Sequence, residues 1–152
     1  MNPGRMTKSA EQLVKEFEAA WRNRDGEAMR ALWHPDGKLH TPIVDRAVSP
    51  HELPRLVSLQ VRMSPDLKWN LLGWAVTGDV IYVEWKTSQS VYGQLIEWRG
   101  MDRFAINGKG QILEERVFAD TAPFRLVADE ALRDNAIAAA SNGVSPDTFI
   151  RL

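Results

Sequence analysis

The chain has 152 residues, 44% of them hydrophobic, which suits one domain with a core of its own. Its formal net charge is -1 and no long basic run occurs, so nucleic acid and membrane surfaces are not expected as partners. The sequence has no cysteine, which excludes disulfides, thiol catalysis and thiolate metal sites, and it shows no signal-peptide or membrane-span pattern. We therefore expect a soluble protein of the cytoplasm.

Two helices are predicted near the start of the chain. Residues 1–8 have the composition of a flexible leader, and Ser9 is a suitable N-cap because Gln12 can close a capping box. The apolar stripe that follows predicts a helix to about Arg24. A short second helix is expected over residues 27–33, with Trp33 pointing inward.

A turn, a short strand and a third helix are expected next. The His-Pro-Asp-Gly composition of residues 34–37 is typical of a turn. Residues 38–43 are predicted to be extended. Ser49 is followed by proline and is therefore a suitable cap for a third helix, which should reach about Leu59.

The second half of the chain changes to the alternating pattern of strands, and helical composition then returns. Glycines in Asn107-Gly108-Lys109-Gly110 supply the positive φ that a hairpin turn between the last two strands needs. The predicted segments are strands within 66–76, 80–91 and 93–120, which holds two of them, then a helix over 122–140 and a tail over 141–152.

The separation of helices from strands predicts an α+β fold, with residues 9–140 as one domain. A long, curved, mostly antiparallel sheet with helices packed on one side leaves a space between the two layers. We therefore expect a pocket there.

Asp102 is the strongest chemical lead, because it interrupts an otherwise apolar strand face. A lone carboxylate on such a face must be paired, hydrogen-bonded or protonated. Either it has a raised pKa and serves as a general acid or base, or it pairs with a cation or with backbone N–H groups and is structural. By alternation the face consists of Ile96, Trp98, Gly100, Asp102, Phe104 and Ile106.

The order of elements, and the hairpin rhythm of Asp102, Phe104, Ile106, Gly110, Ile112 and Glu114, resemble the SnoaL-like branch of the nuclear transport factor 2-like superfamily. The resemblance covers about residues 9–130. It implies a cone-shaped fold around a deep apolar pocket, and often a homodimer formed through the sheet. Because the superfamily hosts both enzymes and binding domains, the resemblance leaves the function open.

The resemblance also implies which residues point into the cone. In the limonene epoxide hydrolase of this branch, a Tyr and an Asn on the first strand help to hold the attacking water, and Lys38 and His40 stand at those positions here. Its other water-activating residues are also replaced, so limonene-type epoxide hydrolysis is not expected. The implied inward residues are Lys38, His40, Trp85, Thr87, Trp98, Gly100, Asp102 and Val117.

His40 and Lys38 are the expected assistants of Asp102. Histidine titrates near neutral pH and a buried lysine can have a lowered pKa. The alternatives are that His40 is an ordinary core or rim histidine and that the Lys38 amine reaches water. For the tryptophans, including Trp33, we expect a partly aromatic pocket, with ordinary core packing as the alternative. The three dispersed histidines do not form a metal-ligand pattern, so no metal or cofactor is expected.

Together these features favour a cofactor-free enzyme that binds an apolar, aromatic or cyclic small molecule and performs acid/base chemistry of an isomerase, cyclase or lyase. The alternative is a non-catalytic domain that binds a ligand or a protein. Asp102, His40 and Lys38 are the predicted catalytic residues. The predicted substrate-binding residues are Trp85, Thr87, Trp98, Gly100, Val117 and Trp33.

Overall fold

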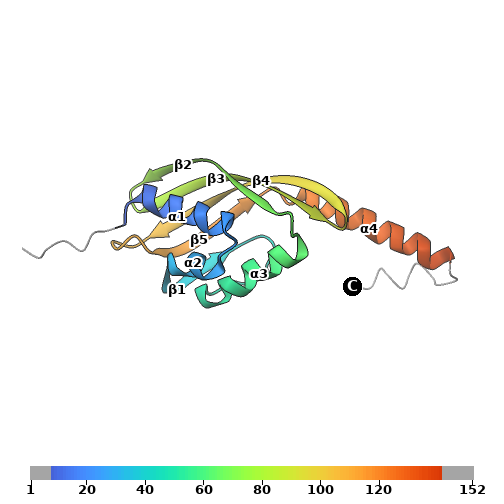
Figure 1. Ribbon diagram of the computed structural model, residues 1–152, viewed down its shortest axis with the longest axis horizontal. Helices are drawn as coiled ribbons and strands as arrows, with labels where there is room; N and C mark the ends of the chain where they lie inside the picture. The colour runs from blue at the N-terminus through green and yellow to red at the C-terminus, as the bar shows by residue number, and fades with distance from the viewer. Residues whose placement is uncertain (1–7, 142–152) are drawn as a thin grey trace, which may run out of the picture.

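A curved sheet with helices on its concave side dominates the computed structural model, which describes residues 8–141 (Figure 1). Over this range the sheet has five strands in the order β1-β5-β4-β3-β2; β1 pairs with β5 in parallel and all other neighbours are antiparallel. This confirms the predicted α+β fold with a mostly antiparallel sheet. The strands are β1 (Trp33–His40), β2 (Lys68–Thr77), β3 (Val80–Val91), β4 (Gln94–Ile106) and β5 (Ile112–Ala119).

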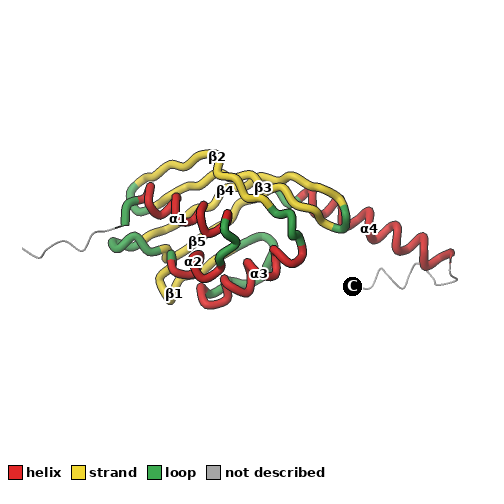
Figure 2. The backbone as a smooth tube through the Cα atoms, in the orientation of Figure 1, coloured by secondary structure: helices red, strands yellow, loops and turns green. Residues whose placement is uncertain are grey.

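The helices that precede β2 in the chain cover one face of the sheet, whereas the last helix extends away from it (Figure 2). Side chains cap the N-termini of the first two helices. Ser9 Oγ accepts a hydrogen bond from the backbone N–H of Gln12, and Asp25 Oδ1 accepts one from the backbone N–H of Ala28. Ser49 and Glu52 form a capping box at the third helical segment. The helices are α1 (Ala10–Arg22), α2 (Gly26–Ala31), the 3₁₀ turn η1 (Pro50–Glu52), α3 (Leu53–Met63) and α4 (Ala122–Ser141).

The turn between β4 and β5 forms where it was predicted. Asn107 Oδ1 accepts the backbone N–H groups of Lys109 and Gln111, each at 3.0 Å. Gly110 has a φ of 72°, which favours glycine. The turn fixes β4 beside β5, and Asp102 lies opposite Val117 in this pairing.

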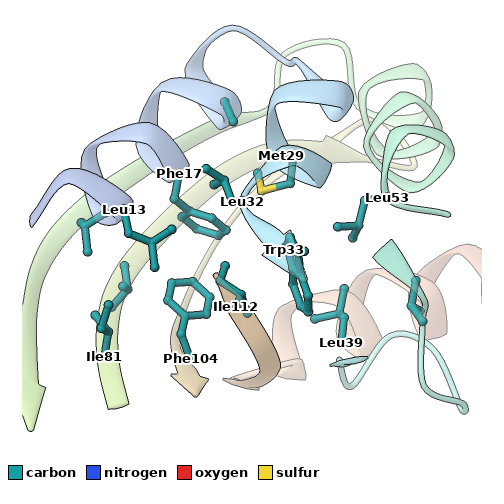
Figure 3. Close-up of a cluster of buried hydrophobic side chains, with 14 residues drawn as sticks. Leu13, Phe17, Met29, Leu32, Trp33, Leu39, Leu53, Ile81, Phe104 and Ile112 are labelled. Carbon is teal, nitrogen blue, oxygen red and sulfur yellow. The ribbon is translucent and has the colours of Figure 1, made fainter. Parts of the chain in front are cut away.

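A cluster of buried apolar side chains joins α1 and α2 to β1, β3, β4 and β5 (Figure 3). Phe17 of α1 meets Phe104 of β4 edge to face, with ring centroids 5.0 Å apart. Trp33 is 4% exposed and lies in this cluster near Leu39 and Ile112. The cluster holds the helices against one part of the concave face and so bounds the cavity described below.

Irregular pairing explains two differences between the strands and the sequence pattern. Residues 34–37 belong to β1 and do not form a separate turn as predicted, but the pairing with β5 shifts register between Trp33 and Lys38, so β1 is irregular over these residues. In β2 the register shifts between Leu71 and Gly73, so Trp74 lies opposite the inward-facing Val83. Strict alternation would place Gly73 on the face of Leu71, and the irregularity moves it to the other face.

The helix boundaries also differ from those predicted. Helix α1 ends at Arg22, because Arg24 already has a φ of 56°, whereas α3 continues past Leu59 to Met63. The predicted leader over residues 1–8 and tail over 141–152 lie, apart from Lys8 and Ser141, outside the described residues.

Candidate functional site

A cavity of about 360 Å³ lies between the concave face of the sheet and the helices. Its walls come from α1, α2, α3, the segment after β1, strands β1 to β5 and the first turn of α4. Most of the lining is apolar, which suits a ligand with an apolar body. The aromatic part of the lining consists of Phe17, Trp21, Trp69, Trp85, Trp98 and Phe124.

Two carboxyl groups share one wall of this cavity. Asp102 is 3% exposed and Glu115 is 6% exposed, and both line the cavity. Asp102 lies opposite Val117 and Glu115 lies opposite Phe104, so the two acids are diagonal neighbours on one face of β4 and β5. Their side chains are hydrogen-bonded to each other, which requires that at least one of them carry a proton.

Burial controls the protonation of this pair. It raises the pKa of Asp102 to about 7, against the lowering effect of hydrogen bonds from Trp85 and Glu115. Burial, followed by the charge of Asp102 and the hydrogen bond to it, raises the pKa of Glu115 well above its ordinary value. Glu115 therefore keeps its proton and donates it in the hydrogen bond to Asp102, and the pair holds one shared proton above neutral pH.

Trp85 decides which of the two carboxyl groups carries the negative charge. Its Nε1–H donates to Oδ1 of Asp102 at 2.8 Å, and a donated hydrogen bond favours the ionised form of the acceptor. Gly100 is the cross-strand partner of Trp85, and a Cβ at this glycine would lie 2.3 Å from Cζ2 of the indole. Only glycine leaves room for the indole there, so Gly100 positions Trp85 instead of lining the cavity.

A second hydrogen-bonded chain fixes Trp98 in the wall. Its Nε1–H donates to Gln89 Oε1 at 3.0 Å, Gln89 Nε2 donates to Ser64 Oγ at 3.1 Å, and Ser64 Oγ donates to the carbonyl of Ser90 at 2.8 Å. The Trp98 ring also lies edge to face with Trp85, with centroids 4.8 Å apart. These contacts hold the aromatic wall in one conformation before a ligand arrives.

The structure brings five of the predicted site residues to the cavity. Trp85, Thr87, Trp98, Asp102 and Val117 all line it. They come from β3, β4 and β5, and the family resemblance had implied that all five point inward.

Lys38 and His40 lie on the opposite face of the sheet, so their expected inward position is wrong. Pairing with β5 places Leu39 beside Glu115, and Leu39 is the β1 residue that lines the cavity. Lys38 is exposed, and His40 Nε2 lies 3.8 Å from a carboxylate oxygen of Glu114. The prediction placed the wrong set of alternate β1 residues toward the cavity. The inward set is determined by pairing with β5, which is distant in the sequence.

Trp33 is also absent from the cavity lining, because it packs into the core shown in Figure 3. The residue that sequence reasoning missed is Glu115. Its signal was present: Val117 was predicted to point inward, and alternation places Glu115, two residues earlier in the same strand, on the same face.

Metal-binding groups do not gather within residues 8–141: no three His, Asp or Glu side chains there are arranged to hold an ion. No helix in the same range is long and apolar enough to cross a membrane.

The curved sheet and the helices packed over its concave face define a protein of the nuclear transport factor 2-like class. Within it, the chain belongs to the SnoaL-like family, because the model of the SnoaL-like domain matches residues 14–115. No curated protein matches the chain.

Several solved structures share the fold at low sequence identity. AclR, a putative hydroxylase from Streptomyces galilaeus, is 18% identical with a TM-score of 0.66, covering 79% of this chain and 95% of its own. IdmH, a putative polyketide cyclase from Streptomyces antibioticus, is 16% identical with a TM-score of 0.65, covering 74% and 93%. TerC, co-crystallised with polyporic acid, is 14% identical with a TM-score of 0.66, covering 76% and 94%.

Proposed function

We propose that the protein is an enzyme that moves a proton within an apolar, cyclic or aromatic substrate, as an isomerase, cyclase or lyase does. The observation that carries this proposal is the Asp102–Glu115 pair, whose two side chains are hydrogen-bonded to each other and buried in the wall of an apolar cavity. Neither carboxyl group has a cation among the interactions that set its pKa. A purely structural carboxylate would be expected to have a cationic partner and a lowered pKa.

The pair supplies the two functions that proton transfer requires. Ionised Asp102 would accept a proton from a carbon next to a carbonyl group, and protonated Glu115 would donate its proton to the carbonyl oxygen or to another carbon of the same substrate. The proton gained by Asp102 then passes to the ionised Glu115 through the hydrogen bond between them, which restores the starting state of the pair, so no oxidant, reductant or cofactor is consumed. A pKa of about 7 for Asp102 matches the pH at which such a base is effective.

The solved relatives support a small-molecule substrate in general terms. IdmH is described as a putative polyketide cyclase, and TerC was crystallised with polyporic acid. The aromatic walls of the cavity suit a flat or cyclic ligand of this kind.

Untargeted mass spectrometry of a metabolite extract tests the proposal. The extract is incubated with wild-type protein, Asp102→Asn, Glu115→Gln and the control Glu114→Gln, in which an acid on the outer face is neutralised. We expect a compound that wild type and the control consume and the two cavity variants do not. If compounds are enriched on all four proteins and none is consumed, the protein is a binding domain and the catalytic proposal fails.

We further propose a homodimer through the convex face of the sheet. Met101 and Phe118 are cross-strand partners on that face and are 40% and 59% exposed, next to Tyr82 on β3. An apolar group of this kind favours contact with a second copy. Light scattering should show a dimer for wild type and a monomer for Phe118→Glu; a monomeric wild type at micromolar concentration would rule the dimer out.

A further inference from the structure

The charges that face the cavity have one sign only. Asp102 and Glu115 are the only ionisable side chains in its described lining, and no lysine, arginine or histidine of that lining faces the pair. The other polar side chains in this lining are the neutral Thr41, Gln60, Thr87 and Gln89.

Several cations of the neighbouring elements are engaged outside the cavity, and no other cation of the described chain is in its lining. Arg103 and Arg116 pair with Glu114 on the outer face, and Lys86 pairs with Glu97. Arg24, near the end of α1, donates to the backbone carbonyls of Pro65 and Leu67. A negatively charged ligand in the cavity would therefore lose its hydration beside a carboxyl pair, with no cation of the described lining to balance it.

The carboxyl pair lies at depth in the cavity, and exposed apolar side chains lie at its rim. The carboxyl pair is 3% and 6% exposed, whereas Ile43, Leu59 and Met63, which line the same cavity, are 47%, 45% and 71% exposed. Thr87 is 3% exposed and lines the same cavity, so a second polar side chain lies at depth beside the pair. A ligand with an apolar body and one polar end fits this gradient if the polar end enters first.

We propose that the site selects uncharged ligands, whose hydroxyl or carbonyl group reaches the Asp102–Glu115 pair while the apolar body contacts the rim, and that it rejects the corresponding carboxylates. This inference rests on the proposed function, since it names the substrate class of the same site. The rejection of carboxylates is a claim beyond the proposed function, because an acid/base enzyme can also act on a negatively charged substrate.

Two probes with one skeleton test the charge selection. Binding of 2-naphthalenemethanol and of 2-naphthoate is measured at pH 8 by quenching of tryptophan fluorescence, since four tryptophans line the cavity. We expect the alcohol to bind at least about tenfold more tightly than the carboxylate in wild type. Equal binding, tighter binding of the carboxylate, or no binding of the alcohol would overturn the proposal.

Neutralising the pair identifies the cause of the selection. In the double variant Asp102→Asn, Glu115→Gln, the preference for the alcohol should fall at least about threefold, whereas Glu114→Gln should keep the wild-type preference. A preference unchanged in the double variant would contradict the assignment. Should the double variant not fold, the wild type is measured at pH 8 and pH 6, because the preference should shrink as the pair gains its second proton.

These binding results separate the inference from the proposed function. A compound consumed by a protein that binds both probes equally would overturn the charge selection and leave the catalytic proposal standing. A tenfold preference for the alcohol, with no compound consumed from any extract, would support the selection and contradict catalysis.

Discussion

Replacing Asp102 by asparagine should make the protein less sensitive to alkaline pH. The native pKa of Asp102 is about 7 against an ordinary value of 3.8, so the native state binds this proton more tightly than the unfolded chain does. Stability from this group is therefore fully present below pH 3.8 and is lost as the pH rises through 7. At about 1.36 kcal/mol per pH unit, the loss approaches 4 kcal/mol.

Asparagine removes this titration but can still accept the N–H of Trp85 and donate to Glu115. Urea unfolding followed by tryptophan fluorescence at pH 5, 6, 7 and 8 should show the variant gaining stability relative to wild type at each step, by about 1 kcal/mol per pH unit up to pH 7. The control Glu114→Gln should instead parallel wild type over this range. Parallel curves for wild type and Asp102→Asn would refute the claim that burial raises this pKa.

Four other substitutions test the geometry of the site. Trp85→Phe removes a hydrogen bond to a charged group, worth about 1.5–3 kcal/mol, and should raise the pKa of Asp102 from about 7 to about 8 or higher in an NMR titration; an unchanged pKa would contradict this. Gly100→Ala places a Cβ against the indole and should lower the free energy of unfolding in urea by about 1–3 kcal/mol, so wild-type stability would count against the packing argument. Lys38→Met and His40→Gln lie on the outer face and should leave binding of 2-naphthalenemethanol within about twofold of wild type; a loss of tenfold or more would restore them to the site.

Local alternation was sufficient to predict which residues share a face of a strand, provided that the strand has no irregularity. In β4 it placed Trp98 and Asp102 on one face, and this face lines the cavity. The same rule, applied to the inward Val117 of β5, reaches Glu115. The carboxyl pair was therefore within reach of the sequence, once both strands of the hairpin were compared.

The remaining features depend on partners that are distant in the sequence. The face of Leu39 is decided by parallel pairing with β5, which no local pattern in β1 reports. The register shift after Leu71 in β2 reverses the alternation of the rest of that strand. The room that Gly100 leaves for Trp85 appears only when two strands are side by side, which is why Gly100 was predicted to touch a ligand instead.

The central claim is that two carboxyl groups share a proton in the cavity wall, and a carboxyl-detected ¹³C NMR titration of wild-type protein tests it most directly. Asp102→Asn and Glu115→Gln assign the two signals. We predict that Asp102 titrates near pH 7 while Glu115 is still protonated there. Ionisation of both carboxyl groups below about pH 5, as in ordinary solvated acids, would contradict the account.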